Sequence, residues 1–254
     1  MNLPNKKNIG ERFWKNKETY KQQATIQKEL CACFATTLFS YNYTLHSIFE
    51  IGCGTGFLTE EIFKNSLPNT YFVNDISPKM KSEIDSIVKQ YCIQNYTFLE
   101  GDAEVIEFPK QLDAIISTST FQWFYDLPLF FKKVADSLQS EGVFAFSTFG
   151  PQNFIEIREV LGKGLEYITE QKLREYLEED FTIVDCGQWE ETLWFDSPKE
   201  VLQHIKNTGV SVFGGSYFGK ENLIDFTNTY IHKYSEDSKV HLTYNPMMII
   251  AKKK

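Results

Sequence analysis

Gly52, Gly54 and Gly56 follow the apolar segment 47–51, and their spacing would let the backbone approach a ligand closely. Glycines placed directly after a strand are typical of the turn that binds a nucleotide cofactor in a Rossmann-like sheet. A dinucleotide site needs a third glycine at position 57, where this chain has Phe57. The turn is therefore poorly matched to a pyrophosphate on a helix N-terminus.

A carboxylate follows at the end of the next apolar segment, 70–74. This residue is Asp75, and its carboxylate can accept hydrogen bonds from both hydroxyls of a ribose. A ribose site without a matching pyrophosphate site favours a cofactor that has adenosine but no phosphates. The two motifs together therefore predict S-adenosylmethionine.

Five more residues near the ends of candidate strands belong to the predicted cofactor site. Glu50 could accept hydrogen bonds near the amino-acid end of the cofactor, and Met80 could lie against the adenine. Asp102 could accept a hydrogen bond from the adenine amino group, while the backbone amide of Ala103 contacts a ring nitrogen. Ser117, close to the end of a fourth candidate strand, completes the set. An acid after a strand is often only a helix cap, so it is the order of these residues at successive strand ends that indicates a cofactor.

The elements that must position these residues alternate between strands and helices. This alternation predicts a doubly wound α/β sheet of the Rossmann type with right-handed crossovers. Ligands of such sheets bind beyond the carboxyl ends of the strands, where the predicted site residues would converge. The expected strands are 47–51, 70–74, 96–100, 112–117 and 143–149, and the expected helices are 11–40, 59–64, 77–88 and 129–138, with Gly142 just past the last helix.

The pattern changes after Gly150. We expect helices over 152–178, an extended segment over 181–195, helices over 197–233 around a glycine-rich break at 209–219, and a final strand over 240–251. Residues 1–254 are expected to form a single domain, in which an N-terminal helical segment and late helical elements close over the cofactor cleft. Its core would comprise about 35–150 with the strands 181–195 and 240–251, and its cap about 1–34, 151–178 and 196–234.

Composition limits the classes of partner. The 254 residues carry a net charge of −8, which disfavours nucleic-acid binding because that function needs an excess of Lys and Arg. No apolar segment reaches the roughly 20 residues of a membrane span, and the first residues are polar and basic. Five cysteines without a Cys-x-x-Cys pair indicate reduced thiols and no metal site, so we expect a cytoplasmic protein. The 22 Phe and 13 Tyr are many for this length, and we interpret the excess as core packing, with a pocket or lid lined by rings as the alternative.

The cofactor motifs resemble those of class I S-adenosylmethionine-dependent methyltransferases. Most of the chain is also similar to one family within that class, the malonyl-[acyl-carrier protein] O-methyltransferases of biotin synthesis. The compact ending after Tyr230 departs from that family. The stretches that carry the similarity are 20–27, Phe121-Gln122-Trp123, 146–150 with Glu156-Ile157-Arg158, and Ser197-Pro198 with 202–210.

This resemblance implies transfer of a methyl group to the free carboxylate of a malonyl group on acyl-carrier protein, which primes the pimeloyl chain of biotin. A carboxylate is ionised at neutral pH, so the reaction needs alignment and removal of water rather than a general base. Tyr20, Gln122 and Trp123 are expected around the acceptor. Arg158 is the first candidate to hold the carboxylate, because a guanidinium matches its geometry. The alternatives are packing roles for Tyr20 and Trp123, and a solvated position for Arg158.

A monomer is expected, and an acidic carrier protein would need a basic face on it. Competing functions are methyl transfer to a free small-molecule acid, methylation of RNA or protein, and cofactor binding without catalysis. The acidic composition disfavours RNA or protein as the substrate, and so does Ser117-Thr118-Ser119-Thr120 in place of an Asn/Asp-Pro-Pro-Tyr motif. The candidate docking clusters are Arg12, Lys15, Lys17 and Lys21, or Lys163, Lys172 and Arg174, although either cluster could be a solvated helix face.

Overall fold

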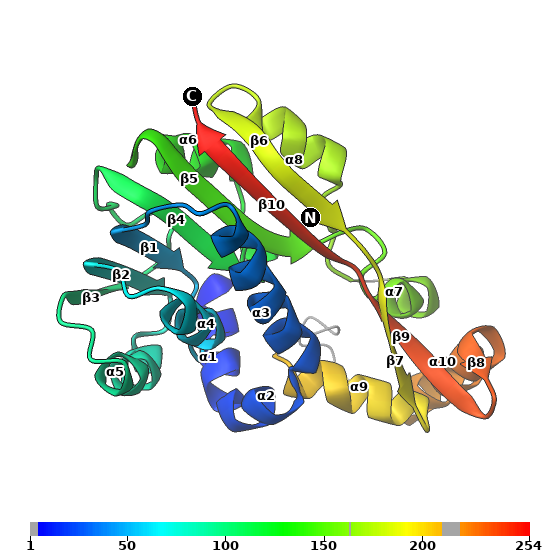
Figure 1. Ribbon diagram of the computed structural model, residues 1–254. Coiled ribbons are helices and arrows are strands. Elements are labelled where there is room, and N and C mark those ends of the chain that lie inside the picture. The colour runs from blue at the N-terminus through cyan, green and yellow to red at the C-terminus, as the bar shows by residue number, and fades with distance from the viewer. Residues whose placement is uncertain (1–4, 163, 210–218) are drawn as a thin grey trace.

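The computed structural model describes residues 5–162, 164–209 and 219–254, and its centre is a seven-stranded sheet (Figure 1). The strands of this sheet are β1 (Ser47–Ile51), β2 (Thr70–Asp75), β3 (Tyr96–Glu100), β4 (Leu112–Thr118), β5 (Leu138–Phe149), β6 (Phe181–Gln188) and β10 (Pro246–Lys253). Their order is β3-β2-β1-β4-β5-β10-β6, and the direction of winding reverses between β1 and β4. The first five strands are parallel, whereas β10 is antiparallel to both β5 and β6. The predicted doubly wound sheet is confirmed.

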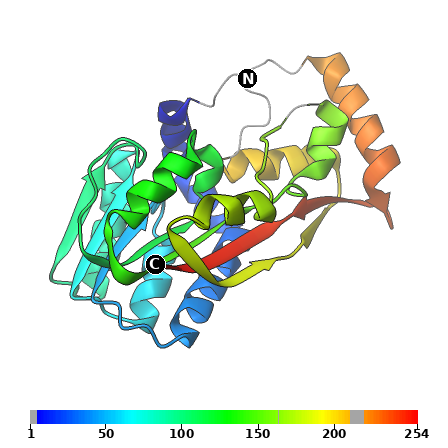
Figure 2. The same cartoon turned by 90° about the horizontal axis from the view of Figure 1, so that it is seen from above.

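Helices cover both faces of this sheet (Figure 2). One face packs against α3 (Thr25–Ser40), α4 (Phe57–Asn65) and α5 (Lys81–Gln90), and Phe34, Ile62 and Ile84 from these helices are fully buried there. The other face packs against α6 (Leu127–Ala135) and α8 (Glu170–Leu177). Each helix therefore buries an apolar stripe against buried strands, which is the usual way that a parallel sheet is stabilised.

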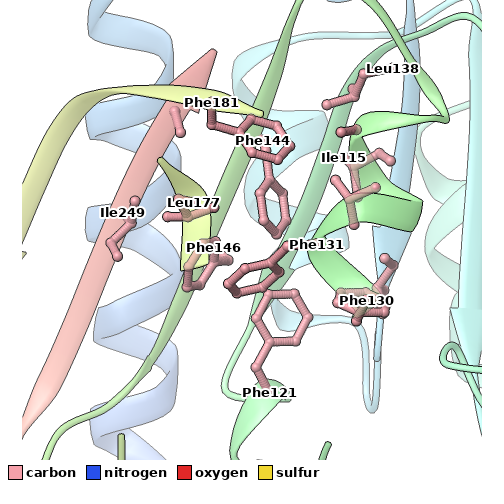
Figure 3. Close-up of a cluster of buried hydrophobic side chains, with 14 of the residues drawn as sticks. Ile115, Phe121, Phe130, Phe131, Leu138, Phe144, Phe146, Leu177, Phe181 and Ile249 are labelled. Atoms are coloured by element: carbon pink, nitrogen blue, oxygen red, sulfur yellow. The ribbon is translucent and has the colours of Figure 1, made fainter. Parts of the chain in front are cut away.

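Phenylalanine rings fill much of the core under α6 (Figure 3). The ring centroids of Phe121 and Phe130 are 5.2 Å apart, and those of Phe144 and Phe146 are 4.8 Å apart. Phe131 lies 5.3 Å from Phe144 in an edge-to-face arrangement, a geometry that aromatic pairs prefer. The interpretation of the aromatic excess as core packing is confirmed for this group.

The expected N-terminal helix 11–40 is three helices, α1 (Lys6–Lys15), α2 (Lys17–Gln23) and α3. The chain turns at Asn16 and again at Ala24, whose φ and ψ of −79° and 56° are not helical. Both turns interrupt an otherwise continuous helical period, so the sequence pattern alone did not reveal them. The bends bring α1 back toward the carboxyl ends of the strands.

The helix expected over 129–138 also ends early, since α6 stops at Ala135 and β5 already begins at Leu138. Gly142 therefore lies inside β5 and does not follow a helix. A β-carbon at Gly142 would lie only 3.1 Å from the carbonyl oxygen of Leu112, so close approach of the backbone explains the glycine.

A second, three-stranded sheet was not predicted. It has the order β7-β9-β8, from β7 (Glu191–Phe195), β9 (Lys239–Tyr244) and β8 (Ser235–Glu236). The segments 181–195 and 240–251, each expected as one core strand, both divide between the two sheets, and Figure 1 shows β9 and β10 as one long ribbon. Asn245 lies at the division, where its side-chain nitrogen donates to the carbonyl oxygen of Trp189 at 2.7 Å.

The remaining elements are the single turns η1 (Pro78–Met80) and η2 (Phe121–Trp123) and the helices α7 (Ile155–Leu161), α9 (Pro198–Asn207) and α10 (Lys220–Tyr234). Ser197 caps α9, because its side chain accepts a hydrogen bond from the amide of Glu200. The predicted cap region 152–178 contains α7 and α8, but α8 packs on the central sheet and belongs to its core. Most of the glycine-rich break 209–219 lies outside the described residues. In the described part of the chain, every helix is too short or too polar to span a membrane.

Candidate functional site

A pocket with about 970 Å³ of space, part of it open to solvent, lies beyond the carboxyl ends of the parallel strands. We call it the strand-end pocket. Parts of the chain that are distant in sequence form its walls: α1, side chains of α2 (Tyr20) and α3 (Gln27, Cys31), the glycine turn after β1, the segment after β2 and the loops after β3 and β4. Its lining includes Gly52, Gly54, Asp75, Met80, Asp102 and Ala103 from the predicted cofactor site.

Gly52 and Gly54 in the glycine turn are required for different physical reasons. Gly52 has a φ of +70°, and a β-carbon there would overlap the side chain of Thr120. Gly54 has a φ of +52°, and no atom lies within 4 Å of the position that a β-carbon would take. That open space faces the pocket, so a ligand can approach the Gly54 backbone directly. Gly56 lies beyond the pocket wall and precedes the first turn of α4.

Asp75 provides a buried acceptor in this pocket. One carboxylate oxygen accepts a hydrogen bond from the amide of Gly54 at 2.9 Å, and the other accepts from the amide of Ser77 at 2.8 Å. Each oxygen keeps a further lone pair for a ligand. Burial raises the pKa of Asp75 to about 6, while the two backbone hydrogen bonds oppose the rise. Asp75 thus keeps free acceptor sites for the two ribose hydroxyls of the predicted site.

Glu50 and Ser117 do not line the pocket. One oxygen of Glu50 accepts hydrogen bonds from the hydroxyls of Thr59 and Tyr71, both at 2.6 Å, and the other oxygen has no partner among the described residues. Burial raises the pKa of Glu50 to about 7. The hydroxyl of Ser117 donates to the carbonyl oxygen of Ile51 at 2.8 Å. Both side chains therefore lie behind the wall and connect the elements that form it.

Asp102 lines the pocket together with a lysine that the sequence analysis missed. The ammonium of Lys6 lies 2.8 Å from a carboxylate oxygen of Asp102 and also pairs with Glu104. It lies 4.4 Å from the ring centroid of Tyr125, close enough for a cation–π contact. Lys6 is only 8% exposed, so this is a buried ion pair between α1 and the loop after β3. No sequence pattern could have revealed a pair so far apart in the chain.

A second pocket adjoins the first, and we call it the ring-walled pocket. The two pockets share Phe13, Tyr20, Gln27, Ser119 and Trp123, and the other lining residues of the second are Gln122, Phe149, Asn153, Phe154, Leu165, Tyr167, Thr208 and Tyr244. Aromatic rings make most of its wall. The structure thus brings together three of the four residues predicted around the acceptor, namely Tyr20, Gln122 and Trp123.

Phe57, which occupies the position of the missing third glycine, also takes part in the site. Its ring stacks on that of Tyr20 with centroids 5.5 Å apart, and both residues line the strand-end pocket. Burial raises the pKa of the Tyr20 hydroxyl, so Tyr20 stays neutral in the physiological range. The aromatic side chain at this position is therefore part of the pocket wall.

Arg158, the fourth residue predicted around the acceptor, does not line either pocket. Its guanidinium donates to the carbonyl oxygen of Pro151 and lies 5.7 Å from the ring centroid of Tyr167, which does line the ring-walled pocket. The ring of Tyr167 therefore lies beside the Arg158 guanidinium and lines the ring-walled pocket, whereas Arg158 itself does not. In the described part of the chain, no three His, Cys, Asp or Glu side chains are grouped so that they could hold a metal ion.

Comparison with solved structures shows the same fold. A crystal structure of the YcgJ protein from Bacillus subtilis matches with a TM-score of 0.64 at 13% identity, over 87% of this chain and 97% of that one. The N-methyltransferase NodS from Bradyrhizobium japonicum, in complex with S-adenosyl-L-homocysteine, matches with a TM-score of 0.55 at 12% identity, over 87% and 85% of the two chains. These likenesses establish a Rossmann-like fold that is shared with methyltransferases.

Sequence comparison gives the family. The profile of the methyltransferase domain matches residues 49–146, from β1 to β5. A malonyl-[acyl-carrier protein] O-methyltransferase from Bacteroides thetaiotaomicron is 34% identical over 98% of this chain and 99% of its own length. Its counterpart from Acinetobacter baylyi is 32% identical over 98% of this chain and 97% of its own length. Because the similarity extends over both pockets and nearly the whole chain, this protein belongs to the malonyl-[acyl-carrier protein] O-methyltransferase family of methyltransferases.

Proposed function

We propose that this enzyme transfers a methyl group from S-adenosylmethionine to the free carboxylate of a malonyl group carried by acyl-carrier protein. In that role it would make the methyl ester that primes the pimeloyl chain in biotin synthesis. The names of its relatives support the acceptor. The observation that carries the proposal is the junction of a ribose-matched pocket with a small ring-walled pocket, because methyl transfer needs a donor and an acceptor in contact.

The strand-end pocket fits the proposed cofactor. Asp75 would accept the ribose hydroxyls, the open backbone at Gly54 would lie against the cofactor, and Met80 would contact the adenine. The Asp102 carboxylate would accept a hydrogen bond from the adenine amino group, and the Ala103 amide would contact a ring nitrogen. The Asp102 carboxylate also pairs with Lys6. When bound, the cofactor supplies a methyl group made electrophilic by a positively charged sulfur.

The ring-walled pocket suits a carboxylate acceptor. A carboxylate oxygen uses its own lone pair to form the new C–O bond, so no side chain has to remove a proton. The reaction joins a negative and a positive centre and leaves neutral products, so it proceeds more readily where water is excluded. Tyr20, Gln122 and Trp123 would enclose the acceptor and orient it. Arg158 could bind the carboxylate directly only if its side chain moved past Tyr167.

Transfer of a labelled methyl group tests this proposal. The protein is incubated with S-adenosylmethionine labelled at the methyl group and with malonyl-acyl-carrier protein, malonyl-coenzyme A or free malonate. We expect a base-labile labelled ester on the malonyl thioesters, and on the carrier-bound form most efficiently. Carrier protein without the malonyl group and the Asp75→Asn variant are the controls. Absence of label from both malonyl thioesters, with intact cofactor binding, would show that the acceptor is wrong.

A further inference from the structure

The ring-walled pocket presents no charged side chain among the described residues that line it, although its proposed ligand is an anion. Its polar groups are hydroxyls and amides. Gln27, Ser119, Thr208 and Tyr244 are among them, and the proposed function has so far given none of the four a role. Gln27 and Thr208 also belong to stretches that carry the sequence resemblance.

Tyr244 is the most strongly fixed of these groups. It ends β9 and is 1% exposed, and its hydroxyl oxygen lies 2.8 Å from Nε2 of His204 on α9. The Thr208 and Gln27 side chains lie near this hydroxyl and act to lower its pKa, while the Thr208 hydroxyl itself donates to the carbonyl oxygens of His204 and Ile205. Burial raises the pKa of Tyr244, so the hydroxyl keeps its proton throughout the physiological range. It is therefore available as a neutral donor at a fixed position.

His204 acts on this hydroxyl from outside the pockets, since it lines neither of them. Burial lowers the pKa of His204 to about 4, and the imidazole is therefore neutral at physiological pH. A neutral imidazole has one N–H donor and one acceptor nitrogen. With Nε2–H donating to the Tyr244 oxygen, the Tyr244 O–H remains free to point toward a ligand.

Two unpartnered polar atoms lie at the junction of the pockets. The side-chain oxygen of Gln27 and the hydroxyl of Ser119 are both buried and have no hydrogen-bond partner among the described residues, and both residues line both pockets. Gln27 as a whole is only 6% exposed. Because an unsatisfied buried polar atom costs about 1–3 kcal/mol, such atoms at a pocket junction point to a ligand that supplies the missing partners.

We infer that Tyr244 and Ser119 bind the acceptor carboxylate through their neutral hydroxyls, and that His204 positions the Tyr244 hydroxyl. This inference rests on the proposed function. A hydroxyl orients the carboxylate, but it holds the lone pair less strongly than a full positive charge would. As the C–O bond forms, the S–C bond breaks and its electron pair stays on sulfur. No proton moves, so neither hydroxyl needs to titrate.

Removal of single donors tests this assignment. We expect Tyr244→Phe to lower kcat/KM for malonyl-acyl-carrier protein by about 10- to 100-fold, as for loss of a hydrogen bond to a charged group. The affinity for S-adenosylmethionine should change less than about twofold, because Tyr244 does not line the strand-end pocket. The matched control is Tyr234→Phe, since the Tyr234 hydroxyl binds Glu159 away from both pockets.

A double-mutant cycle tests the role of His204. His204→Leu should lower kcat/KM for the carrier-bound substrate, and His204→Gln should retain most of it because an amide can still hydrogen-bond the Tyr244 hydroxyl. In the Tyr244→Phe background, His204→Leu should have almost no further effect. His232→Leu, at an exposed histidine on α10, is the control.

Several results would overturn the inference. A Tyr244→Phe enzyme with kcat/KM within about twofold of the wild type would exclude Tyr244 as a donor. If His204→Leu lowered kcat/KM by the same factor in the Tyr244→Phe background as in the wild type, His204 would not act through that hydroxyl. Failure of the proposed function has a different signature, because the wild-type enzyme itself would then label no malonyl thioester.

Discussion

Asp75 is the residue whose ionisation should be visible in cofactor binding. Burial raises its pKa to about 6, and the ionised form accepts hydrogen bonds at both oxygens. As pH falls through this pKa, the carboxylate gains a proton and loses acceptor capacity. We therefore expect the affinity for S-adenosylmethionine to be highest above about pH 7 and to fall between about pH 7 and 5, as measured by titration calorimetry.

Two variants identify the source of this pH dependence. Asp75→Asn should bind weakly at every pH and lack the step near the Asp75 pKa. Glu50 has a pKa of about 7 and is therefore largely protonated where Asp75 titrates, so Glu50→Gln should leave the step near the Asp75 pKa in place. A step unchanged in position and size in Asp75→Asn would assign the titration to another group.

From the sequence, some residues of the strand-end pocket could be predicted, and others were missed by one position along a strand. Gly54, Asp75 and Met80 line the pocket, because each lies at the very end of a strand or in the turn that follows it. Glu50 and Ser117 lie inside strands, where successive side chains point to opposite faces. Ile51 and Thr118, the next residue in each strand, line the pocket instead. In both strands the predicted residue and the residue that lines the pocket are therefore direct neighbours, whose side chains point to opposite faces of the sheet.

At the scale of elements, one lysine joins the start of α1 to the loop after β3 at the strand-end pocket. Lys6 is the first residue of α1 and joins it to Asp102 and Glu104. Breaking a buried ion pair costs roughly 3–5 kcal/mol, and the cost should be lower here because Asp102 remains 26% exposed. We expect Lys6→Ala to increase amide hydrogen exchange across α1 and to speed cofactor dissociation, measured by stopped flow.

Lys7→Ala is the matched control for this prediction, because Lys7 lies next to Lys6 on the same helix with an exposed side chain. It should leave exchange in α1 and cofactor dissociation unchanged. Equal effects of the two substitutions would show that loss of a charge anywhere on α1 is sufficient. In that case the ion pair with Asp102 and Glu104 would have no special part in holding the helix.

The division of two long strands between two sheets depends on Asn245. Its side chain donates to the carbonyl oxygen of Trp189 and accepts from the side chain of Gln188, both at 2.7 Å, and from the amide of Gln152 at 3.2 Å. We expect Asn245→Ala to lower the free energy of unfolding by about 2–4 kcal/mol in urea, since buried polar groups lose their partners. Asn228→Ala, at an exposed position on α10, should change it by less than about 0.5 kcal/mol.

This division also marks a limit of prediction from sequence. The segments 181–195 and 240–251 read as extended throughout, and the observed strands cover nearly all of both. The side-chain hydrogen bonds of Asn245 lie where both segments leave the central sheet, and they join residues far apart in the chain. Hydrogen bonds between residues so far apart leave no periodic pattern in the sequence. The local pattern therefore predicted the strands but not the sheet to which each half belongs.

At the scale of the whole molecule, docking of an acidic carrier depends on cations that other side chains do not neutralise. Lys17 and Lys21 both pair with Glu83, and Lys172 pairs with Glu175 on its own helix. Lys15 on α1 is exposed and has no acidic partner in the described part of the chain, and the same holds for Lys206 on α9.

Lys15 and Lys206 lie close to the proposed acceptor site. The side chain of Asn16, next to Lys15, donates to the carbonyl oxygen of Lys206 at 3.3 Å. Phe13 and Thr208, each two residues from one of the lysines, line the ring-walled pocket. A carrier protein that docks against these two lysines would therefore deliver its malonyl group to the entrance of that pocket, even though the enzyme as a whole has a net charge of −8.

Charge reversal should distinguish this face from the rest of the surface. We expect Lys15→Glu with Lys206→Glu to raise KM for malonyl-acyl-carrier protein by about 10-fold at low ionic strength, and by less as added salt screens the charges. KM for malonyl-coenzyme A should change much less, because this substrate lacks the acidic surface of the carrier. Lys172→Glu on α8 is the control for a change of net charge. If it raises KM for the carrier-bound substrate while the double variant does not, the carrier docks against α8, the second basic cluster in the sequence.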